Sequence, residues 1–298
     1  MTRPAQTVAA RVARHGWTTS QFALLGLLVL AAAWACLPAW QDIFRQSIRR
    51  SDAGYILLVL PVAAYLFWIR RSRAKFVRCR PSAWGTLAVL IGLTFCWYGD
   101  EVDLQVARHV GAIVTVAGAI LAMTGLEALR QFGAVFLTLL FLVPVPGVFR
   151  TRIAIPLQEG ATAFTDSVLN LIGVTSQRAG AVLTIHGTPI AVGEACDGMR
   201  MVFALVLVVF AFVFSVPFRP TTRIVLIALS PLVALICNIV RLVPTAIVYG
   251  FAEPATAEQV HDIAGWLMLP LALVLLLGVV RLMRWLDLPV FRWRMLAT

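Results

Sequence analysis

The sequence has little charge. Asp, Glu, Lys and Arg together make up 13% of its 298 residues, whereas 60% are hydrophobic and the mean hydropathy is +0.89. A soluble domain of this length exposes too much surface to hide so many apolar side chains. The scarcity of charge therefore excludes a soluble globular protein and predicts a polytopic membrane protein, for which lipid is part of the solvent.

The sequence also lacks paired cysteines, internal repeats and low-complexity segments. None of its five cysteines stands at Cys-x-x-Cys spacing from another, which argues against a zinc or redox motif. We therefore predict no metal and no cofactor. The absence of internal repeats also argues against the inverted repeats that are typical of many transporters.

What the sequence does contain is a series of apolar runs. A membrane span needs about 17–25 mostly apolar residues. Eight runs approach this length, at about 20–40, 53–69, 83–99, 107–126, 132–149, 199–217, 222–249 and 262–283. We predict an all-α membrane protein: a polytopic bundle of about eight transmembrane helices forming one integral-membrane domain over residues 1–298. Soluble tails are expected at about 1–19 and 284–298, and one long extracytoplasmic loop at about 150–198.

The basic residues predict the orientation of the chain. Residues 70–80 (RRSRAKFVRCR) contain six basic residues and no acid, whereas residues 99–105 (GDEVDLQ) contain no Lys or Arg. Because basic loops stay in the cytoplasm, this predicts an inner (plasma) membrane protein with both termini cytoplasmic, although residues 42–50 place three arginines outside. Anionic inner-leaflet lipid explains the net charge of +11. Nucleic acid is not an expected partner, because no aromatic interleaving or recognisable module accompanies the basic residues.

The long loop contains two patterned segments. Residues 155–174 have helical apolar spacing with Glu159 and Asp166 off the apolar face, which predicts an interfacial amphipathic helix. Residues 179–196 contain two short β-prone runs around HGTP, which predicts a hairpin turn. Loops longer than about 15 residues are usually functional. This one ends at a cysteine.

That cysteine, Cys196, lies in the segment EACDGMR with Glu194, Asp197 and Arg200. The other four cysteines lie in apolar runs, where they are expected to act as small hydrophobes, or in the basic loop. A thiol at a helix N-terminus with an arginine one turn on has the setting that lowers its pKa and favours the thiolate. Cys196 is therefore a candidate nucleophile, with an ordinary loop cysteine before a span as the alternative.

Candidate partners of Cys196 lie at the same predicted membrane level. The seventh run contains NIVR, with Asn238 and Arg241 three residues apart and thus on one helix face. An arginine inside an apolar run is costly, which favours function over interfacial snorkelling. His261 begins the motif HDIAG at the start of the eighth run. His186, in the expected turn, is the rival histidine.

The motifs EACDGMR, NIVR and HDIAG, in this order over about residues 80–285, resemble the exosortase/archaeosortase family of multi-span cysteine transpeptidases. The resemblance implies eight spans and a catalytic trio of Cys196, Arg241 and His261. Asn238 matches the family's asparagine, whereas Asp197 stands where Ser or Asn is common. Glu194, Asp197 and Arg200 are supporting candidates.

The chemistry of these side chains fits cleavage through a thioester. Cys196 is expected to attack the scissile carbonyl, His261 to exchange the proton, and Arg241 to stabilise the oxyanion, since guanidinium cannot act as a base. The resemblance implies secreted substrates with a C-terminal sorting signal of a short motif, one transmembrane helix and a basic tail. The acyl acceptor is not identified. The alternatives are a transporter with Asn238, Arg241 and His261 along its path, or a lipid-modifying transferase.

Overall fold

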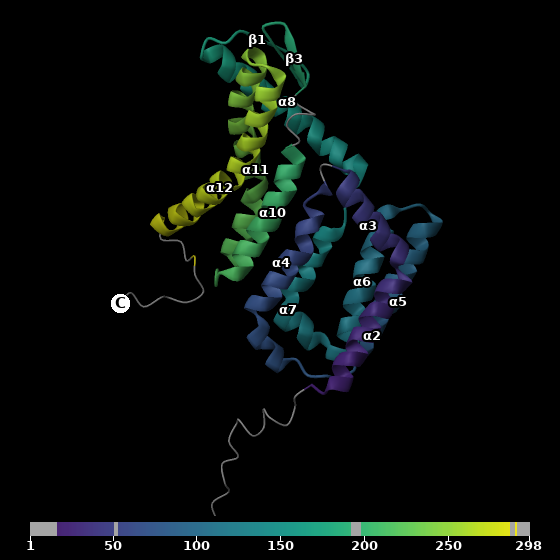
Figure 1. Ribbon diagram of the computed structural model, residues 1–298. Coiled ribbons are helices and arrows are strands. Elements are labelled where there is room, and N and C mark those ends of the chain that lie inside the picture. The colour runs from purple at the N-terminus through teal and green to yellow at the C-terminus, as the bar shows by residue number, and fades with distance from the viewer. Residues whose placement is uncertain (1–16, 51–52, 192–197, 287–289, 291–298) are drawn as a thin grey trace, which may run out of the picture. The chain divides into compact units, whose positions relative to one another are not determined.

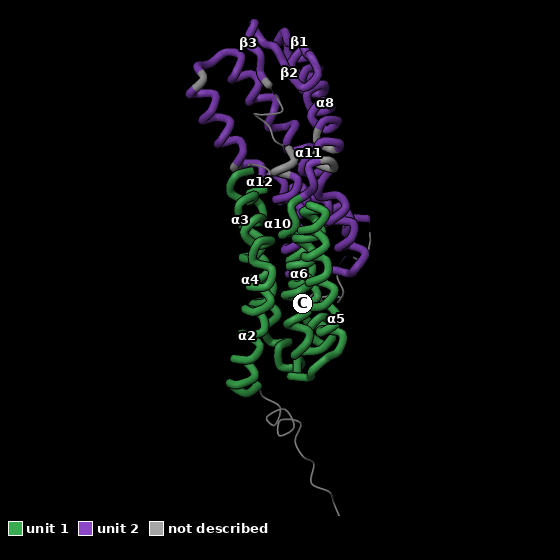
Figure 2. Tube along the Cα trace, turned by 90° about the vertical axis from the view of Figure 1, so that its right-hand side faces the viewer, with its two compact units in different colours: residues 1–144 green, residues 145–298 purple. Residues whose placement is uncertain are grey.

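The computed structural model describes residues 17–50, 53–191, 198–286 and 290. Within these ranges, the side chains of residues 148–150, 153–154, 191, 198–201, 254, 266 and 269 are not described. The structure is 81% helical, which confirms the predicted all-α class. The chain divides into two compact units, Met1–Pro144 and Val145–Thr298, drawn in green and purple in Figure 2. A single domain over residues 1–298 stays a prediction.

The described part of unit 1 is a bundle of α-helices with two short 3-10 helices. In chain order these are α2 (Thr19–Ala35), α3 (Leu37–Arg49), α4 (Ile56–Ile69), η2 (Arg71–Phe76), α5 (Ala83–Glu101), α6 (Gln105–Thr124), α7 (Leu126–Leu139) and η3 (Leu140–Leu142). Helices α5 and α2 both pack on α6, and α4 packs on α7 (Figure 1).

A break at Cys36 separates α2 from α3. Pro38 lies in the first turn of α3, where a backbone N–H has no partner within the helix, so the missing N–H of proline does not destabilise α3. Proline cannot continue the preceding helix α2, because it lacks the N–H and its ring clashes with the preceding turn. The two helices bend by 74°. The run predicted at about 20–40 is therefore not one straight helix, and it makes either a broken span or a re-entrant segment.

The contact between α5 and α6 depends on glycines spaced seven residues apart. An added Cβ on Gly92 would lie 2.6 Å from the backbone nitrogen of Thr115, and one on Gly99 would lie 2.5 Å from that of Arg108. Any other residue would force the backbones apart at these positions. The two helices therefore pack backbone against backbone, as small residues allow in membrane proteins.

Unit 2 contains four described helices and a small antiparallel sheet. The helices are α8 (Gly147–Leu171), α10 (Gly198–Ser215), α11 (Pro220–Phe251) and α12 (Pro254–Trp285). The strands are β1 (Ser176–Ala179), β2 (Val182–Ile185) and β3 (Thr188–Ala191), in the order β1-β2-β3, with Ser176 opposite Ile185 and Val182 opposite Ala191. Helix α11 is central, because α8, α10, α12 and the sheet all contact it (Figure 1).

The predicted hairpin is confirmed. His186 and Gly187 form a two-residue turn with φ angles of 50° and 80°, and positive φ at both positions suits the twist of a tight hairpin. The sequence did not predict β1, whose residues SQRA show no apolar alternation. The helix expected at 155–174 is also present as α8, which begins earlier and buries Ala161 and Leu169 on one face.

The count of eight spans is not confirmed. Within the described residues, three helical segments are long and apolar enough to cross a membrane: Gln105–Thr124, Pro220–Phe251 and Ala255–Trp285, with the bent pair α2–α3 as a fourth. The run predicted at 132–149 is wrong as a single helix, because α7 ends at Leu139 and Pro144 and Pro146 interrupt the chain before α8.

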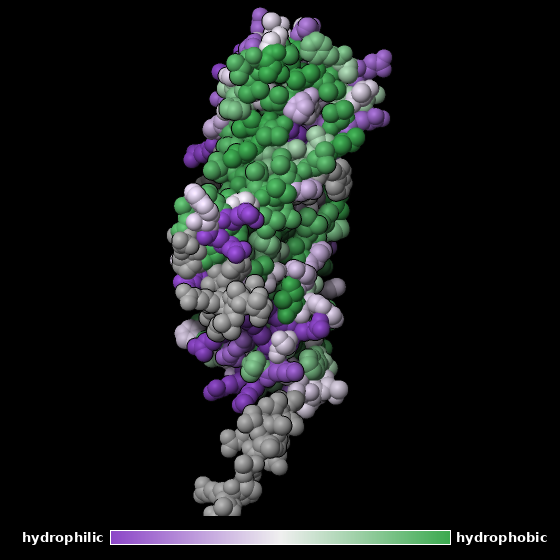
Figure 3. Space-filling model, turned by 90° about the vertical axis from the view of Figure 1, so that its left-hand side faces the viewer, coloured by the Kyte–Doolittle hydropathy of each residue, from purple (hydrophilic) through white to green (hydrophobic). Residues whose placement is uncertain are grey.

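The surface nevertheless suits a lipid environment. Many large hydrophobic side chains are exposed, among them Leu30 (72%), Trp34 (75%) and Leu232 (52%). Hydrophobic side chains form broad continuous areas on the face drawn in Figure 3. Monomeric soluble proteins rarely expose apolar patches of this extent.

Candidate active site

Helix α11 buries an arginine. Arg241 is 9% exposed and Asn238 is 4% exposed, so the guanidinium does not snorkel to solvent. Arg241 Nη2 donates a hydrogen bond to Asn238 Oδ1 at 3.3 Å, as the spacing of three residues predicts. One turn on, Thr245 Oγ1 donates to the backbone carbonyl of Arg241 at 2.7 Å. The polar residues of NIVR thus share the buried face of α11.

Among the described residues, little compensates the charge of Arg241. No carboxylate among the described residues forms an ion pair with it, and its Nε is buried without a hydrogen-bond partner in that part of the chain. Among the described residues, the neutral amide oxygen of Asn238 is the side-chain acceptor of this guanidinium. A buried guanidinium that lacks a counter-ion is costly. It is also suited to receive a negative charge that forms during a reaction.

Helix α12 brings the HDIAG motif to this arginine. A Cβ added to Gly265 would lie 3.6 Å from Arg241 Nη1, so the backbone of α12 passes close to the guanidinium. His261 is half-buried and lies one turn before Gly265 on the same face of α12. It is seven residues inside the helix, which begins at Pro254, and not at the helix start as predicted. Two motifs that are separate in the sequence therefore meet between α11 and α12.

Helix α10 begins near the level of Asn238. The 18 residues of α10 rise about 27 Å and end just before the short connection to α11. Asn238 lies about 27 Å along α11 from Pro220, and α11 packs against α10, so Asn238 is near the level at which α10 begins. Cys196, Glu194 and Asp197 precede α10 and lie outside the described residues. Arg200 lies in the first turn of α10, and its side chain is not described.

The sheet packs on the C-terminal part of α11. Leu183 of β2 packs with Leu242, the residue after Arg241, and Ile185 packs with Ala246. Gly250 allows the close approach, since a Cβ there would come 2.5 Å from Ile185 Cγ2. The rival His186 is exposed in the turn, with its ring 4.5 Å from that of Phe251. Phe251 lies about 15 Å along α11 from Arg241, so this histidine is not part of the Arg241 cluster.

A comparison with known families fits this arrangement. Residues 40–278 match the transmembrane exosortase family (Exosortase_EpsH), which is more than half of the 298-residue chain. The chain belongs to the transmembrane exosortase family. The match to exosortases includes all three motifs and confirms the resemblance predicted from them. Searches of curated proteins and of solved structures gave no match. Membership of the exosortase family supports a membrane transpeptidase-type role.

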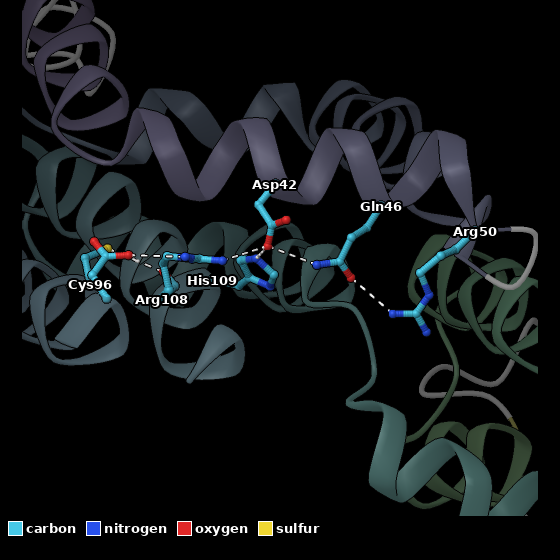
Figure 4. A network of polar contacts seen from close by, with 7 residues as sticks. Asp42, Gln46, Arg50, Cys96, Arg108 and His109 are labelled. Carbon is cyan, nitrogen blue, oxygen red and sulfur yellow. Dashed lines mark hydrogen bonds and ion pairs between the residues drawn. The ribbon is translucent and has the colours of Figure 1, made fainter. Parts of the chain in front are cut away.

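This exosortase also contains a polar cluster in unit 1 that the sequence analysis missed (Figure 4). Asp42 Oδ2 on α3 accepts hydrogen bonds from Arg108 Nη2 at 2.9 Å and Gln46 Nε2 at 2.9 Å, and lies 2.8 Å from His109 Nε2. Arg108 Nη1 donates to Asp100 Oδ1 at 3.3 Å. An acid, an arginine and a histidine beside apolar runs are the signal that could have revealed it.

Two cysteines adjoin this cluster. Cys36 and Cys96 were expected to act as small hydrophobes, and both are buried. Their Sγ atoms lie 3.2 Å apart, and Cys96 Sγ donates to the backbone oxygen of Arg108 at 3.4 Å. His109 is only 1% exposed. These contacts hold the bend between α2 and α3 against helices α5 and α6. No group of three or more His, Cys, Asp or Glu residues able to hold a metal ion occurs in the described ranges.

Proposed function

We propose that this exosortase is a cysteine transpeptidase or endopeptidase that cleaves a C-terminal sorting signal from secreted proteins through a thioester. The observation that carries the proposal is the meeting of NIVR on α11 with HDIAG on α12, around a buried guanidinium with no described carboxylate. Cys196, two residues before α10 begins, supplies the nucleophile.

In the first step the Cys196 thiolate attacks the scissile carbonyl carbon and forms a C–S bond. The carbonyl oxygen becomes an oxyanion, which the Arg241 guanidinium stabilises. The C–N bond then breaks, and the imidazolium of His261 gives its proton to the leaving amine. The result is a thioester on Cys196, with the transmembrane helix and basic tail of the substrate released. Asn238 acts as a positioning residue, because its amide oxygen orients the guanidinium.

In the second step an acceptor nucleophile attacks the thioester. His261, now neutral, takes the proton of the acceptor, and the Cys196 thiolate leaves. Water as the acceptor makes the enzyme a protease. An amine or hydroxyl on an envelope molecule makes it a sorting transpeptidase.

The site belongs, in this proposal, at the extracytoplasmic boundary of the inner membrane, with both termini in the cytoplasm. Arg241 lies about 32 Å along α11 from Pro220, and the hydrocarbon core of a bilayer is about 30 Å thick. If α11 begins at the cytoplasmic side, as the basic loops predict, Arg241 reaches the outer boundary. A substrate that is itself anchored by one helix can present its motif at that level.

The decisive experiment replaces the thiol. In cells that produce Cys196→Ala, secreted proteins with the tripartite C-terminal signal should stay at full length in the membrane, as judged by immunoblot. Cys79→Ala, which removes a cysteine from the basic loop, is the matched control and should process them normally. Normal processing by Cys196→Ala would overturn the proposal and favour the transporter or lipid-transferase alternatives.

Orientation needs a separate test. In variants that keep one cysteine each, a membrane-impermeant maleimide added to intact spheroplasts should label Cys196 and leave Cys79 unlabelled. Labelling of Cys79 alone would reverse the proposed topology, whatever the outcome of the processing assay.

A further inference from the structure

Unit 1 contains a basic pocket that the proposed chemistry does not use. It has a volume of about 1090 Å³ and lies where η2 leads into α5 and where α6 passes into α7. Four cationic side chains line it: Lys75, Arg78, Arg80 and Arg130. Among the described residues that line it, the acidic one is Glu127. The pocket is therefore strongly positive.

Most of this charge has no carboxylate partner among the described residues. Glu127 lies 3.8 Å from Arg130 and accepts a hydrogen bond from Gln131 at 2.6 Å. In the part of the chain that the structure describes, no carboxylate forms an ion pair with Lys75, Arg78 or Arg80. These three cations remain available to an anionic ligand.

The backbone around the pocket is fixed. Arg80 N–H donates to Met123 O at 2.8 Å, and Ser82 N–H donates to Ala122 O at 2.9 Å, so the basic loop is tied to the end of α6. Val77, which lies between Lys75 and Arg78 in the sequence, is buried in the apolar cluster with Leu121. Lys75, Arg78 and Arg80 therefore lie on a segment that backbone hydrogen bonds and the packing of Val77 hold in place.

An apolar hollow adjoins the pocket. It has a volume of about 510 Å³ and is lined by Ala83, Trp84, Thr86, Leu87 and Leu90 of α5, and Ala83 also lines the basic pocket. Trp84, Leu87 and Leu90 are 66%, 45% and 58% exposed. An acyl chain can pack on this apolar surface, whereas a soluble phosphate compound has no apolar part to place there.

We propose that this pair of hollows is a binding site for an anionic glycerophospholipid. Its phosphate and headgroup lie among Lys75, Arg78 and Arg80, and one acyl chain follows α5 over Trp84 and Leu87. Basic pockets between helices on the cytoplasmic side of a membrane suit anionic headgroups, and charge-assisted bonds to phosphate are strong. The bound lipid would hold the α4–α5 loop and the α6–α7 turn together.

The test uses the full-length chain purified in a neutral detergent and measures retained lipid by native mass spectrometry after titration with phosphatidylglycerol or phosphatidylcholine. Wild type should retain phosphatidylglycerol preferentially. The double variant Arg78→Gln/Arg80→Gln should bind it roughly tenfold or more weakly, since two cations near the phosphate are lost. Arg73→Gln is the matched control: it removes a cation of the same basic run that does not line the pocket, and it should bind as wild type does.

Two further measurements separate a specific lipid site from its alternatives. A diazirine on the acyl chain of phosphatidylglycerol should crosslink to the segment of α5 with Trp84 and Leu87, and Leu87→Gln should lower that yield. Equal retention of the two lipids, or a loss in Arg73→Gln as large as in the double variant, would overturn the proposal. So would full displacement of the lipid by inorganic phosphate, which would indicate a soluble ligand.

Discussion

Units 1 and 2 each carry an arginine on a membrane helix, and the two differ in what surrounds the charge. Arg108 on α6 contacts two carboxylates, Asp42 at 2.9 Å and Asp100 at 3.3 Å. Arg241 on α11 is more deeply buried and has the neutral oxygen of Asn238 as its side-chain hydrogen-bond partner among the described residues. Charge compensation inside the protein favours a role in the fold. A buried charge without a counter-ion favours a role in binding a ligand or in stabilising a transition state.

The same contrast appears in the histidines. His109 is 1% exposed and lies 2.8 Å from the carboxylate that also pairs with Arg108. His261 is half-buried and lies on the face of α12 that meets Arg241. Each unit therefore places an arginine and a histidine together, and among the described residues the arginine that contacts two acids is the one in unit 1. The comparison predicts that unit 1 variants change stability and that unit 2 variants change turnover.

The largest effect is expected at Arg241. Arg241→Lys keeps the charge but loses the planar set of donors, so processing of the sorting signal should fall by about 100-fold or more. Protein level and thermal midpoint should stay near those of wild type, because no ion pair with a described residue is broken. Quantitative immunoblots of cleaved and full-length substrate measure the first quantity. Processing close to wild type would mean that Arg241 supplies general charge alone.

A smaller effect, on stability, is expected at Arg108. Arg108→Gln removes two charge-assisted contacts from a partly solvent-accessible cluster and should cost about 1–3 kcal/mol. The midpoint of unfolding in detergent should fall, while turnover per folded molecule should not change. Arg73→Gln is the control, since Arg73 is exposed and forms no ion pair with a described residue, so its loss should matter little. A loss of turnover without a loss of stability in Arg108→Gln would break the comparison.

The smallest effect is expected at Gly265. Its added Cβ would lie 3.6 Å from Arg241 Nη1, an ordinary contact distance, so Gly265→Ala should fold and lower turnover by only a few-fold. Gly278→Ala, on the same helix with nothing within 4 Å of the added Cβ, should have no effect. Equal activities of the two alanine variants would show that the approach of α12 to Arg241 is not critical for turnover.

Much of the candidate site could be predicted because it rests on local patterns. The three-residue spacing of Asn238 and Arg241 predicts a shared face, and the structure has them in contact. The turn at His186–Gly187 follows from short β-prone runs around residues that tolerate positive φ. These features need no knowledge of distant contacts.

The rest depends on packing that local patterns do not encode. The prediction from hydropathy joined α2 and part of α3 into one span. It also extended the fifth predicted span past Pro144 and Pro146. The Asp42 cluster joins residues more than sixty positions apart, so no spacing rule finds it. The approach of Gly265 to Arg241 likewise depends on how α11 and α12 pack.

The most direct test of thioester formation on Cys196 is the mass of the enzyme during turnover. Purified wild-type protein mixed with a peptide that carries the sorting motif should form an adduct equal in mass to the acyl part of the peptide. Peptide mapping should place it on Cys196, and neutral hydroxylamine should remove it, as expected for a thioester. We expect no adduct with Cys196→Ala and far less with Arg241→Lys. An adduct on Cys36, Cys79, Cys96 or Cys237, or cleavage by wild type with no adduct on Cys196, would contradict it.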